Sequence, residues 1–312
     1  MIEYKHVALL GLGLISSSIA HALRRAGFDG KIVGTARSAA TRQQAAALGF
    51  CTRIAETNRE AVTGADLVII CTPVGAMGGI AAEIAPALSP GATVTDVGSV
   101  KCRIIEAVSP HIPDGVDFIP GHPLAGTEHS GPASGFAELF DNRWCLLTPL
   151  EGTETAAIER LGTFWQALGS RVDTMDPSHH DLVLAVTSHV PHLIAYTMVG
   201  VADDLQRVTE SEVVNYSAAG FRDFTRIAAS DPTMWRDVFL NNKEATLEIL
   251  GRFTEELFAL QRAIRTGDGD HLHDYFTHTR AIRRGIIDAG QDTAAPDFGR
   301  FVAAKLPPKE PS

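Results

Sequence analysis

The chain has 312 residues, of which 45% are hydrophobic and 21% charged, a composition typical of a soluble globular protein with room for two domains. Its 27 basic and 37 acidic side chains leave a formal net charge of −10, which argues against nucleic acid or an anionic membrane as a partner. No leader-like segment opens the chain, no apolar stretch approaches the length needed to cross a bilayer, and the four cysteines are widely spaced, so we expect a cytoplasmic protein without a metal site.

The first half of the chain alternates short apolar runs, which predict buried strands, with segments that have helical spacing. The expected strands are His6–Leu10, Lys31–Gly34, Leu67–Cys71, Ala92–Asp96, Phe118–Pro120, Trp144–Thr148 and Arg171–Met175. The expected helices are Ser17–Ala26, Ala39–Leu48, Gly78–Leu88 and Ala156–Leu168. Strands that alternate with helices of this length predict an α/β Rossmann-type domain, with a doubly wound parallel sheet, over residues 1–175.

After Met175 the pattern becomes helical. Asp176-Pro177 is typical of a helix start, and amphipathic periods over Asn241–Arg265 and Asp270–Ile287 predict two long helices. No segment in this half alternates as a strand would. We therefore expect an all-helical domain over residues 176–298, followed by a tail over residues 299–312 whose proline-rich end is predicted to be disordered.

A glycine-rich turn lies between the first expected strand and the first expected helix. Gly11 permits a tight turn, and Gly13 lets a pyrophosphate approach the helix start, where free N–H groups and a partial positive charge favour phosphate. Ser16 replaces the third glycine of the usual pattern. The turn could also bind nothing, but its position between a strand and a helix favours a dinucleotide. The predicted cofactor-binding residues here are Gly11, Leu12, Gly13, Leu14, Ile15 and Ser16.

The end of the second expected strand indicates which nicotinamide cofactor is used. An NAD-dependent protein usually has an acidic residue there for the ribose 2′-hydroxyl, and Thr35-Ala36-Arg37-Ser38 has none. Arg37 can bind a 2′-phosphate through two hydrogen bonds, with Thr35 and Ser38 as further donors. The simpler alternative is a solvated surface arginine. We expect NADP to be preferred, with NAD possible.

Two further strand ends are predicted to line the same crevice, because ligands of open α/β sheets bind beyond the carboxyl ends of the strands. Thr72, Pro73 and Val74 follow one strand, and Ser99 follows the next. Ser99 could instead cap the helix that follows it.

The segment Gly121–Pro132 is rich in glycine, proline and polar side chains and is expected to form a loop. It contains His122, Thr127 and Glu128. Such a loop is either a plain connection or a support for chemistry, and the choice depends on the residues around it.

Two segments of the helical half are unusual. Pro191 lies between His189 and His192 and is expected to bend a helix, which can turn one histidine toward a cavity. No third ligand has a matching spacing, so these histidines do not predict a metal site. The segment Gly220–Trp235 contains Arg226, whose guanidinium could bind a small carboxylate; a surface ion pair is the alternative.

The chain resembles the prephenate/arogenate (cyclohexadienyl) dehydrogenase family of tyrosine biosynthesis. The resemblance lies in Gly11–Ser18, Asp96–Lys101, Gly121–Pro132, Ser188–His192 and Gly220–Trp235. It implies a Rossmann domain followed by a helical domain that forms a homodimer. It also implies oxidative decarboxylation of prephenate, arogenate or both, with hydride transfer to NADP or NAD, to give 4-hydroxyphenylpyruvate, tyrosine or both.

The resemblance further implies roles for single residues. His122 matches the catalytic histidine, and Ser99 matches a catalytic residue between nicotinamide and substrate. Ala36 departs from the family pattern, since NAD-using members have Asp there. The substrate-binding residues implied are Ser99, His122, Thr127, Glu128, His192, Asp223, Arg226 (the carboxylate-binding arginine) and Trp235.

Two other functions fit parts of the sequence. A β-hydroxyacid dehydrogenase or imine reductase shares the domain order but uses a lysine on a long interdomain helix, and no lysine lies between Lys101 and Lys243. A non-catalytic NADP-binding redox sensor would leave His122, His192 and Arg226 without a role. The sequence does not choose between prephenate and arogenate.

Overall fold

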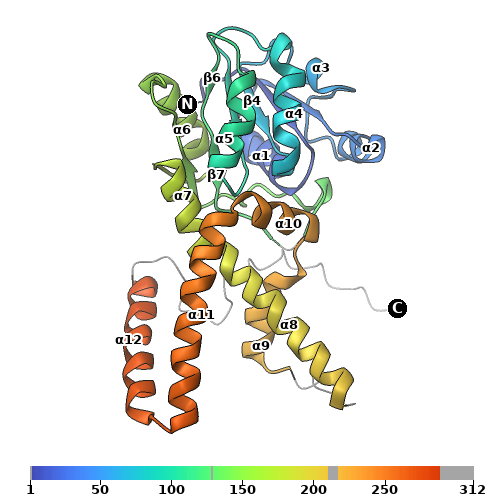
Figure 1. The fold of residues 1–312 in the computed structure, drawn as a ribbon. Coiled ribbons are helices and arrows are strands. Elements are labelled where there is room, and N and C mark those ends of the chain that lie inside the picture. Colours follow the sequence, from blue (N-terminus) through green and yellow to red (C-terminus); the bar gives the residue numbers. More distant parts are fainter. Residues whose placement is uncertain (1, 128, 210–216, 289–312) are drawn as a thin grey trace, which may run out of the picture. The chain divides into compact units, whose positions relative to one another are not determined.

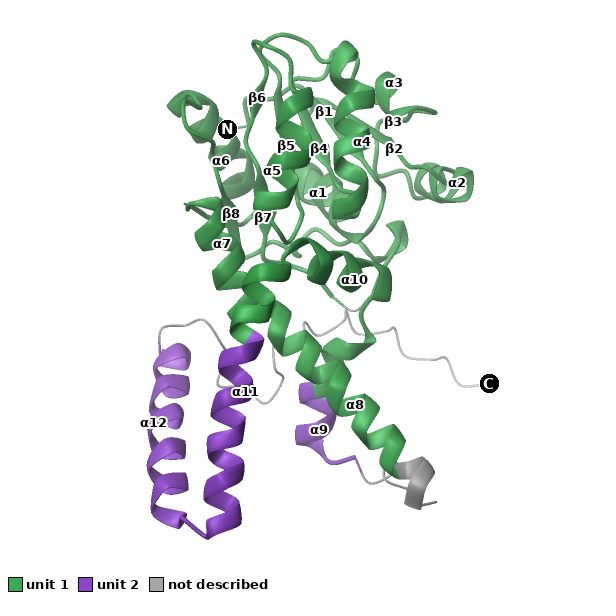
Figure 2. Cartoon of the chain, in the orientation of Figure 1, with its two compact units in different colours: residues 1–215, 225–249 green, residues 216–224, 250–312 purple. Residues whose placement is uncertain are grey.

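The fold is that of a computed structural model, which describes residues 2–127, 129–209 and 217–288. The chain divides into two compact units, one of residues 1–215 and 225–249 and the other of residues 216–224 and 250–312 (Figure 2). The domain boundary expected at residue 175 lies inside the first unit, and it stays a prediction.

The first unit is built on a six-stranded parallel sheet (Figure 1). Its strands follow the order β3-β2-β1-β4-β5-β6, and every neighbouring pair is parallel. This is the strand order of a dinucleotide-binding Rossmann fold, which confirms the predicted fold class. The strands are β1 His6–Leu10, β2 Lys31–Thr35, β3 Arg53–Ile54, β4 Leu67–Ile70, β5 Thr93–Asp96 and β6 Asp117–Phe118.

Helices cover both faces of this sheet, because successive side chains of a buried strand point to opposite faces. Val7 and Leu9 of β1 belong to a core with residues of α1, α2 and α6, whereas Ala8 and Leu10 belong to a second core with residues of α3, α4 and α5. Helix α4 begins at Val74, four residues before Gly78, where the sequence predicted its start. The helices are α1 Leu14–Arg25, α2 Ala39–Leu48, α3 Asn58–Val62, α4 Val74–Ile84, α5 Cys102–Val108 and α6 Thr155–Ala167, with short 3₁₀ turns at Ala85–Ala87, Ser109–His111 and Pro132–Ser134.

A second sheet of three strands follows β6. It consists of β7 Gly121–Pro123, β8 Trp144–Leu147 and β9 Arg171–Thr174, with β7 and β8 antiparallel and β8 and β9 parallel. The loop expected over Gly121–Pro132 is therefore wrong for its first three residues. Their pairing with β8 is a long-range contact, and Pro123 is tolerated because β7 is an edge strand.

The remaining helices of the first unit pack against the Rossmann part. Asp176 starts α7 by accepting hydrogen bonds from the backbone N–H groups of Ser178 and His179. A π-helical turn lies just before Pro191, where a bend was expected. These elements are α7 Pro177–Leu184, the π turn Ala185–His189, α8 Val190–Thr209, the 3₁₀ turn Arg226–Ala229, α10 Pro232–Asn241 and the start of α11 Lys243–Thr266.

The second unit, taken by itself, contains most of α9 Ala219–Thr225, the greater part of α11, and α12 Gly269–Asp288. Helices α11 and α12 lie side by side as a hairpin (Figure 2), and Gly267 makes the turn between them with a φ of 71°. Both long helices expected from the sequence are confirmed to within two residues at each end.

One helical stretch corrects an expectation about membranes. Pro177–Leu205 spans 29 residues and contains an 18-residue window with a mean hydropathy of 1.5, so by length and composition alone it could cross a bilayer. Core helices of soluble proteins pass the same test. This stretch is interrupted by the π turn, and it carries buried polar residues, His180, Asp181 and His189, that bond inside the first unit.

Candidate active site

The turn between β1 and α1 has the shape that a dinucleotide needs. Gly11 has a φ of 98°, and a Cβ on it would lie 2.6 Å from the carbonyl oxygen of Cys71, so only glycine fits. A Cβ on Gly13 would meet nothing within 4 Å, which leaves open space at the start of α1. Backbone N–H groups with open space above them fit the pyrophosphate of NAD(P).

Ser16 is accommodated inside this turn rather than pushing the helix away. Its hydroxyl accepts a hydrogen bond from the Gly13 N–H (2.8 Å) and closes a capping box at the start of α1. The side chains of Leu12, Leu14 and Ile15 pack against the core.

At the end of β2, the three residues predicted to bind the cofactor have different surroundings. The hydroxyl of Thr35 is buried and donates to the Ala55 carbonyl (3.0 Å), so the expected role of Thr35 as a donor to the cofactor has no support in its geometry. Arg37 and Ser38 are exposed, and Ser38 caps α2. The sequence reading missed Arg42, which donates to the Ala36 carbonyl (2.7 Å) in the same loop.

The ends of β4 and β5 lie beside the glycine turn. A Cβ on Gly11 would also come within 2.8 Å of the Thr72 methyl group, so Thr72 packs on the turn. The Thr72 hydroxyl is buried and has no hydrogen-bond partner among the described residues. Pro73 is exposed, and Val74 is buried at the start of α4. Ser99 is half-buried and does not cap α5, whose N-cap is Lys101.

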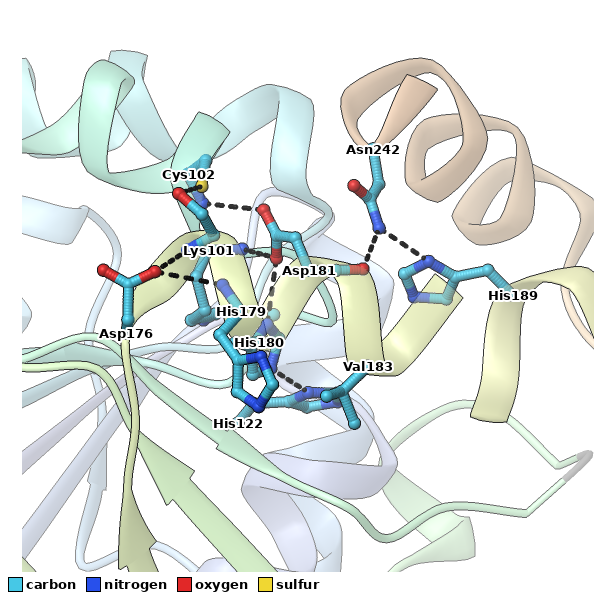
Figure 3. A network of polar contacts seen from close by, with 12 residues as sticks. Lys101, Cys102, His122, Asp176, His179, His180, Asp181, Val183, His189 and Asn242 are labelled. Carbon is cyan, nitrogen blue, oxygen red and sulfur yellow. Dashed lines mark hydrogen bonds and ion pairs between the residues drawn. The ribbon is translucent and has the colours of Figure 1, made fainter. Parts of the chain in front are cut away.

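His122 lies in β7 and is almost completely buried, at 7% exposure. Its Nδ1 lies 2.9 Å from Nε2 of His180, and Nδ1 of His180 lies 2.9 Å from Oδ1 of Asp181 (Figure 3). The Asp181 carboxylate also accepts the backbone N–H groups of Lys101 (2.7 Å) and Cys102 (2.9 Å). Three side chains from β7 and α7 thus form one continuous buried hydrogen-bonded chain.

A buried ion pair holds the strand that carries His122. Lys101 and Asp96 are both fully buried, and Nζ of Lys101 donates to the Asp96 carboxylate and to the Gly121 carbonyl (2.7 Å). Asp96 accepts the N–H groups of Gly98 (2.7 Å) and Gly121 (3.2 Å). Both polar groups of the Gly121 backbone are therefore tied to the end of β5, which fixes the position of His122.

Burial keeps the histidines of this region neutral. It lowers the pKa of His122 well below its ordinary value, and electrostatic interactions with His180, Lys101 and His189 act in the same direction. Burial also lowers the pKa of His189, to about 4. At neutral pH His122 is therefore an uncharged imidazole that can accept a proton.

Residues predicted for the substrate come together on α8 and α10. The rings of His192 and Trp235 are stacked, with centroids 3.6 Å apart, and Trp235 is buried. Burial lowers the pKa of His192, as does the guanidinium charge of Arg226, which belongs to the 3₁₀ turn that packs against α8. The His189 ring approaches Trp235 edge to face, 6.2 Å between centroids, and so connects the stack to the His122 region.

Three further residues are predicted to bind the substrate. Thr127 is exposed, and its hydroxyl accepts the N–H of His129 (3.2 Å). Asp223 lies on α9 in the second unit. Glu128 lies outside the described residues. Their roles stay predictions.

Comparison with known proteins decides the family. A family model described as prephenate dehydrogenase, nucleotide-binding domain, matches residues 19–174, and one described as prephenate dehydrogenase, dimerization domain, matches residues 176–278. The chain belongs to the prephenate dehydrogenase family.

Individual members of the family are similar over nearly the whole chain. The cyclohexadienyl dehydrogenase of Zymomonas mobilis is 41% identical over 286 residues, which cover 92% of this chain and 97% of the relative. The prephenate dehydrogenase of Bacillus subtilis is 33% identical, over 90% of this chain and 76% of the relative. Among solved structures, prephenate dehydrogenase from Aquifex aeolicus in complex with hydroxyphenyl propionate and NAD+ superposes with a TM-score of 0.84 at 33% identity, covering 90% of this chain and 98% of that one.

Several polar residues of this prephenate dehydrogenase family member were missed by sequence reasoning. His180 and Asp181 complete the chain from His122, and Asn242 donates to the Asp181 carbonyl (2.8 Å) and to Nδ1 of His189 (3.0 Å). One signal was available: the run His179-His180-Asp181 is polar within an otherwise apolar helical segment. It does not show which partner the side chains meet.

Proposed function

We propose that this chain catalyses the oxidative decarboxylation of prephenate, arogenate or both, with hydride transfer to NADP or NAD. The observation that carries the proposal is His122, a buried neutral histidine in a strand tied to the carboxyl end of β5, within the same Rossmann fold as the glycine turn. Family membership makes this chemistry the expected one, and the geometry supplies a base for it.

The proposed role of His122 follows from the substrate. The ring of prephenate or arogenate carries a hydroxyl and a hydrogen on C4 and a carboxylate on C1. His122 accepts the hydroxyl proton, so electron density on the oxygen rises and the C4 hydrogen leaves with its electron pair. A bound nicotinamide supplies the acceptor for that hydride. The C1 carboxylate then leaves as CO2, its bonding electrons make the ring aromatic, and the proton returns from His122 to the phenol oxygen.

The remaining predicted residues have matching roles. Ser99 lies between cofactor and substrate and supports His122. Arg226 binds a substrate carboxylate, and His192 and Trp235 line the pocket beside it, which the ring stack and the shift in the His192 pKa support. Thr127, Glu128 and Asp223 are proposed to recognise the side-chain end of the substrate.

We further propose that NADP is preferred over NAD. The β2–α2 loop presents the exposed Arg37 and Ser38 and has no carboxylate of its own to bind a ribose 2′-hydroxyl. Arg42 adds a second guanidinium beside the same loop, where it also pairs with Glu56 (2.9 Å). Two guanidinium groups favour a 2′-phosphate.

The assembly and location are also proposed. Residues 1–175 bind the cofactor, and residues 176–298 bind the substrate and form a homodimer. Exposed large apolar side chains on α11 and α12, including Leu257, Phe258, Ile264, Phe276 and Ile282, support an interface there. The four cysteines are free thiols, as in a reducing cytoplasm.

The test is the absorbance of the reduced cofactor at 340 nm. The purified chain is mixed with prephenate or with arogenate, each in the presence of NADP or of NAD, and kcat/KM is measured for the four pairs. We expect turnover with at least one substrate and a higher kcat/KM with NADP. Cofactor binding without turnover on either substrate would contradict the proposed enzyme and favour a sensor.

A further inference from the structure

The buried chain Asp181–His180–His122 carries an inference beyond the assignment of a base. We propose that His180 and Asp181 are positioning residues that hold His122 in the tautomer with its proton on Nδ1 and its lone pair on Nε2. The inference deepens the proposed function and rests on it for its catalytic consequence, because Nε2 is then the atom that accepts the substrate proton.

The hydrogen-bond partners determine the tautomer step by step. An ionised carboxylate can only accept, so the 2.9 Å contact between Asp181 Oδ1 and His180 Nδ1 requires the proton of His180 to be on Nδ1. Neutral His180 then has a lone pair on Nε2. The 2.9 Å contact of that Nε2 with His122 Nδ1 therefore requires the His122 proton to be on Nδ1.

The first step of this proton assignment is well defined, because the Asp181 carboxylate is held as a hydrogen-bond acceptor. Burial alone would raise the pKa of Asp181, but the hydrogen bonds from His180 and from the backbone N–H groups of Cys102 and Lys101 lower it. A protonated carboxyl would leave one of these donors unpaired. Burial lowers the pKa of His180 as well, so this ring is neutral and its Nε2 is an acceptor.

The hydrogen-bonded series Asp181–His180–His122 also explains how the substrate proton stays inside the protein during the reaction. When Nε2 of His122 takes the substrate proton, its Nδ1 proton can shift along the hydrogen bond to His180, where the Asp181 carboxylate stabilises the cation. Beyond His180, the Asp181 carboxylate accepts two backbone N–H groups, which do not relay protons. It also contacts the Cys102 thiol, whose pKa burial raises to about 11, so this thiol stays protonated and the path ends there. A closed path suits the proposed reaction, in which the proton returns to the product.

The charged and titratable groups around the His122 ring come from five further segments. They are His180 and Asp181 on α7, Lys101 before α5, Asp96 on β5, His189 in the π turn and Cys145 on β8. Lys101 is bonded to Asp96 and to the Gly121 carbonyl, and Nδ1 of His189 faces Asn242. Among the described residues, His180 is the group placed within hydrogen-bond distance of the His122 ring.

The tautomer is measurable without turnover. Protein labelled with ¹⁵N in its histidines gives a long-range ¹H–¹⁵N spectrum in which protonated and unprotonated ring nitrogens have distinct shifts, and the spectrum of His122→Asn identifies the His122 signals. We expect His122 to have a protonated Nδ1 and an unprotonated Nε2 at neutral pH. A protonated Nε2 in the wild-type protein would overturn the proposal.

Two substitutions of His180 separate hydrogen bonding from packing. His180→Phe fills the space without an acceptor, and we expect it to shift His122 toward the Nε2-protonated form and lower kcat by about 10²-fold with little change in KM. His180→Gln keeps an acceptor oxygen, and we expect it to retain the tautomer and most of kcat. Equal losses in both variants, or an unchanged tautomer in His180→Phe, would overturn the proposal.

The two proposals fail in different ways. A protein that turns over neither substrate but shows the Nδ1-protonated His122 would contradict the proposed function and leave the positioning role standing. An active enzyme whose His122 is protonated on Nε2 would contradict the positioning role alone.

Discussion

The buried pair of Lys101 and Asp96 allows a quantitative test of the framework beneath His122. Lys101→Met keeps the length of the side chain and removes its charge, which leaves the Asp96 carboxylate with only the backbone donors of Gly98 and Gly121. Both side chains are fully buried, and removing one partner of such a pair costs about 3–5 kcal/mol. Asp96→Asn removes the partner of Lys101 and is expected to cost a similar amount.

Urea unfolding followed by tryptophan fluorescence, at one fixed protein concentration, measures these losses. We expect the double variant to lose less than the sum of the single variants by about 1–3 kcal/mol, because the two groups are coupled. The control is Arg103→Met, which removes an exposed ion pair with Glu106 and is expected to cost less than about 1 kcal/mol. A loss below about 1 kcal/mol in Lys101→Met, or additive losses, would refute the reasoning.

Three further predictions follow from the geometry. Gly11→Ala should lower the unfolding free energy by about 1–3 kcal/mol or more, because Gly11 has a positive φ and a Cβ there would clash with the Cys71 carbonyl. Gly13→Ala should leave the unfolding free energy unchanged and weaken the binding of NADP in a calorimetric titration. Equal losses of stability in the two variants would contradict this prediction. Arg37→Ala should lower kcat/KM with NADP at least about tenfold and leave kcat/KM with NAD unchanged, and a parallel loss with both would remove Arg37 from 2′-phosphate binding. Burial depresses the pKa of His189 from 6.5 to about 4, so the unfolded chain binds more protons in that window and stability should fall on acidification from pH 6.5 to 4, by about 3 kcal/mol at about 1.4 kcal/mol per unit. His189→Gln should make this pH dependence shallower, and an unchanged slope in urea titrations would show that His189 is not the group responsible.

The Rossmann part of the fold could be predicted because its signals are local. The run His6–Leu10 is apolar throughout and forms β1 with the expected ends, and Ala39–Leu48 forms α2 between an N-cap serine and a left-handed glycine. Short elements were missed: β3 has two residues and α3 has five, too few for a period to show. The start of α4 was placed late because glycines between Val74 and Gly79 obscure its apolar face.

The site residues that belong to a local sequence motif were predicted, and those defined only by long-range contacts were missed. His122 stood out through its glycine- and proline-rich surroundings, yet β7 was taken for a loop, because its partner β8 lies more than twenty residues further along the chain. His180 contacts a residue 58 positions away, and its own helix gives no sign of that partner. Thr35 was expected at the cofactor because of its position, but a hydroxyl can be satisfied by a neighbouring strand end, here the Ala55 carbonyl.

The most direct test of the central claim is the kcat of His122→Asn with the preferred substrate and cofactor. His129→Asn is the matched control, because it changes an exposed histidine of the same segment. If His122 is the base, its substitution lowers kcat by about 10²–10⁴-fold with little change in KM, and His129→Asn keeps the wild-type rate. A His122→Asn enzyme with unchanged kcat would contradict the account.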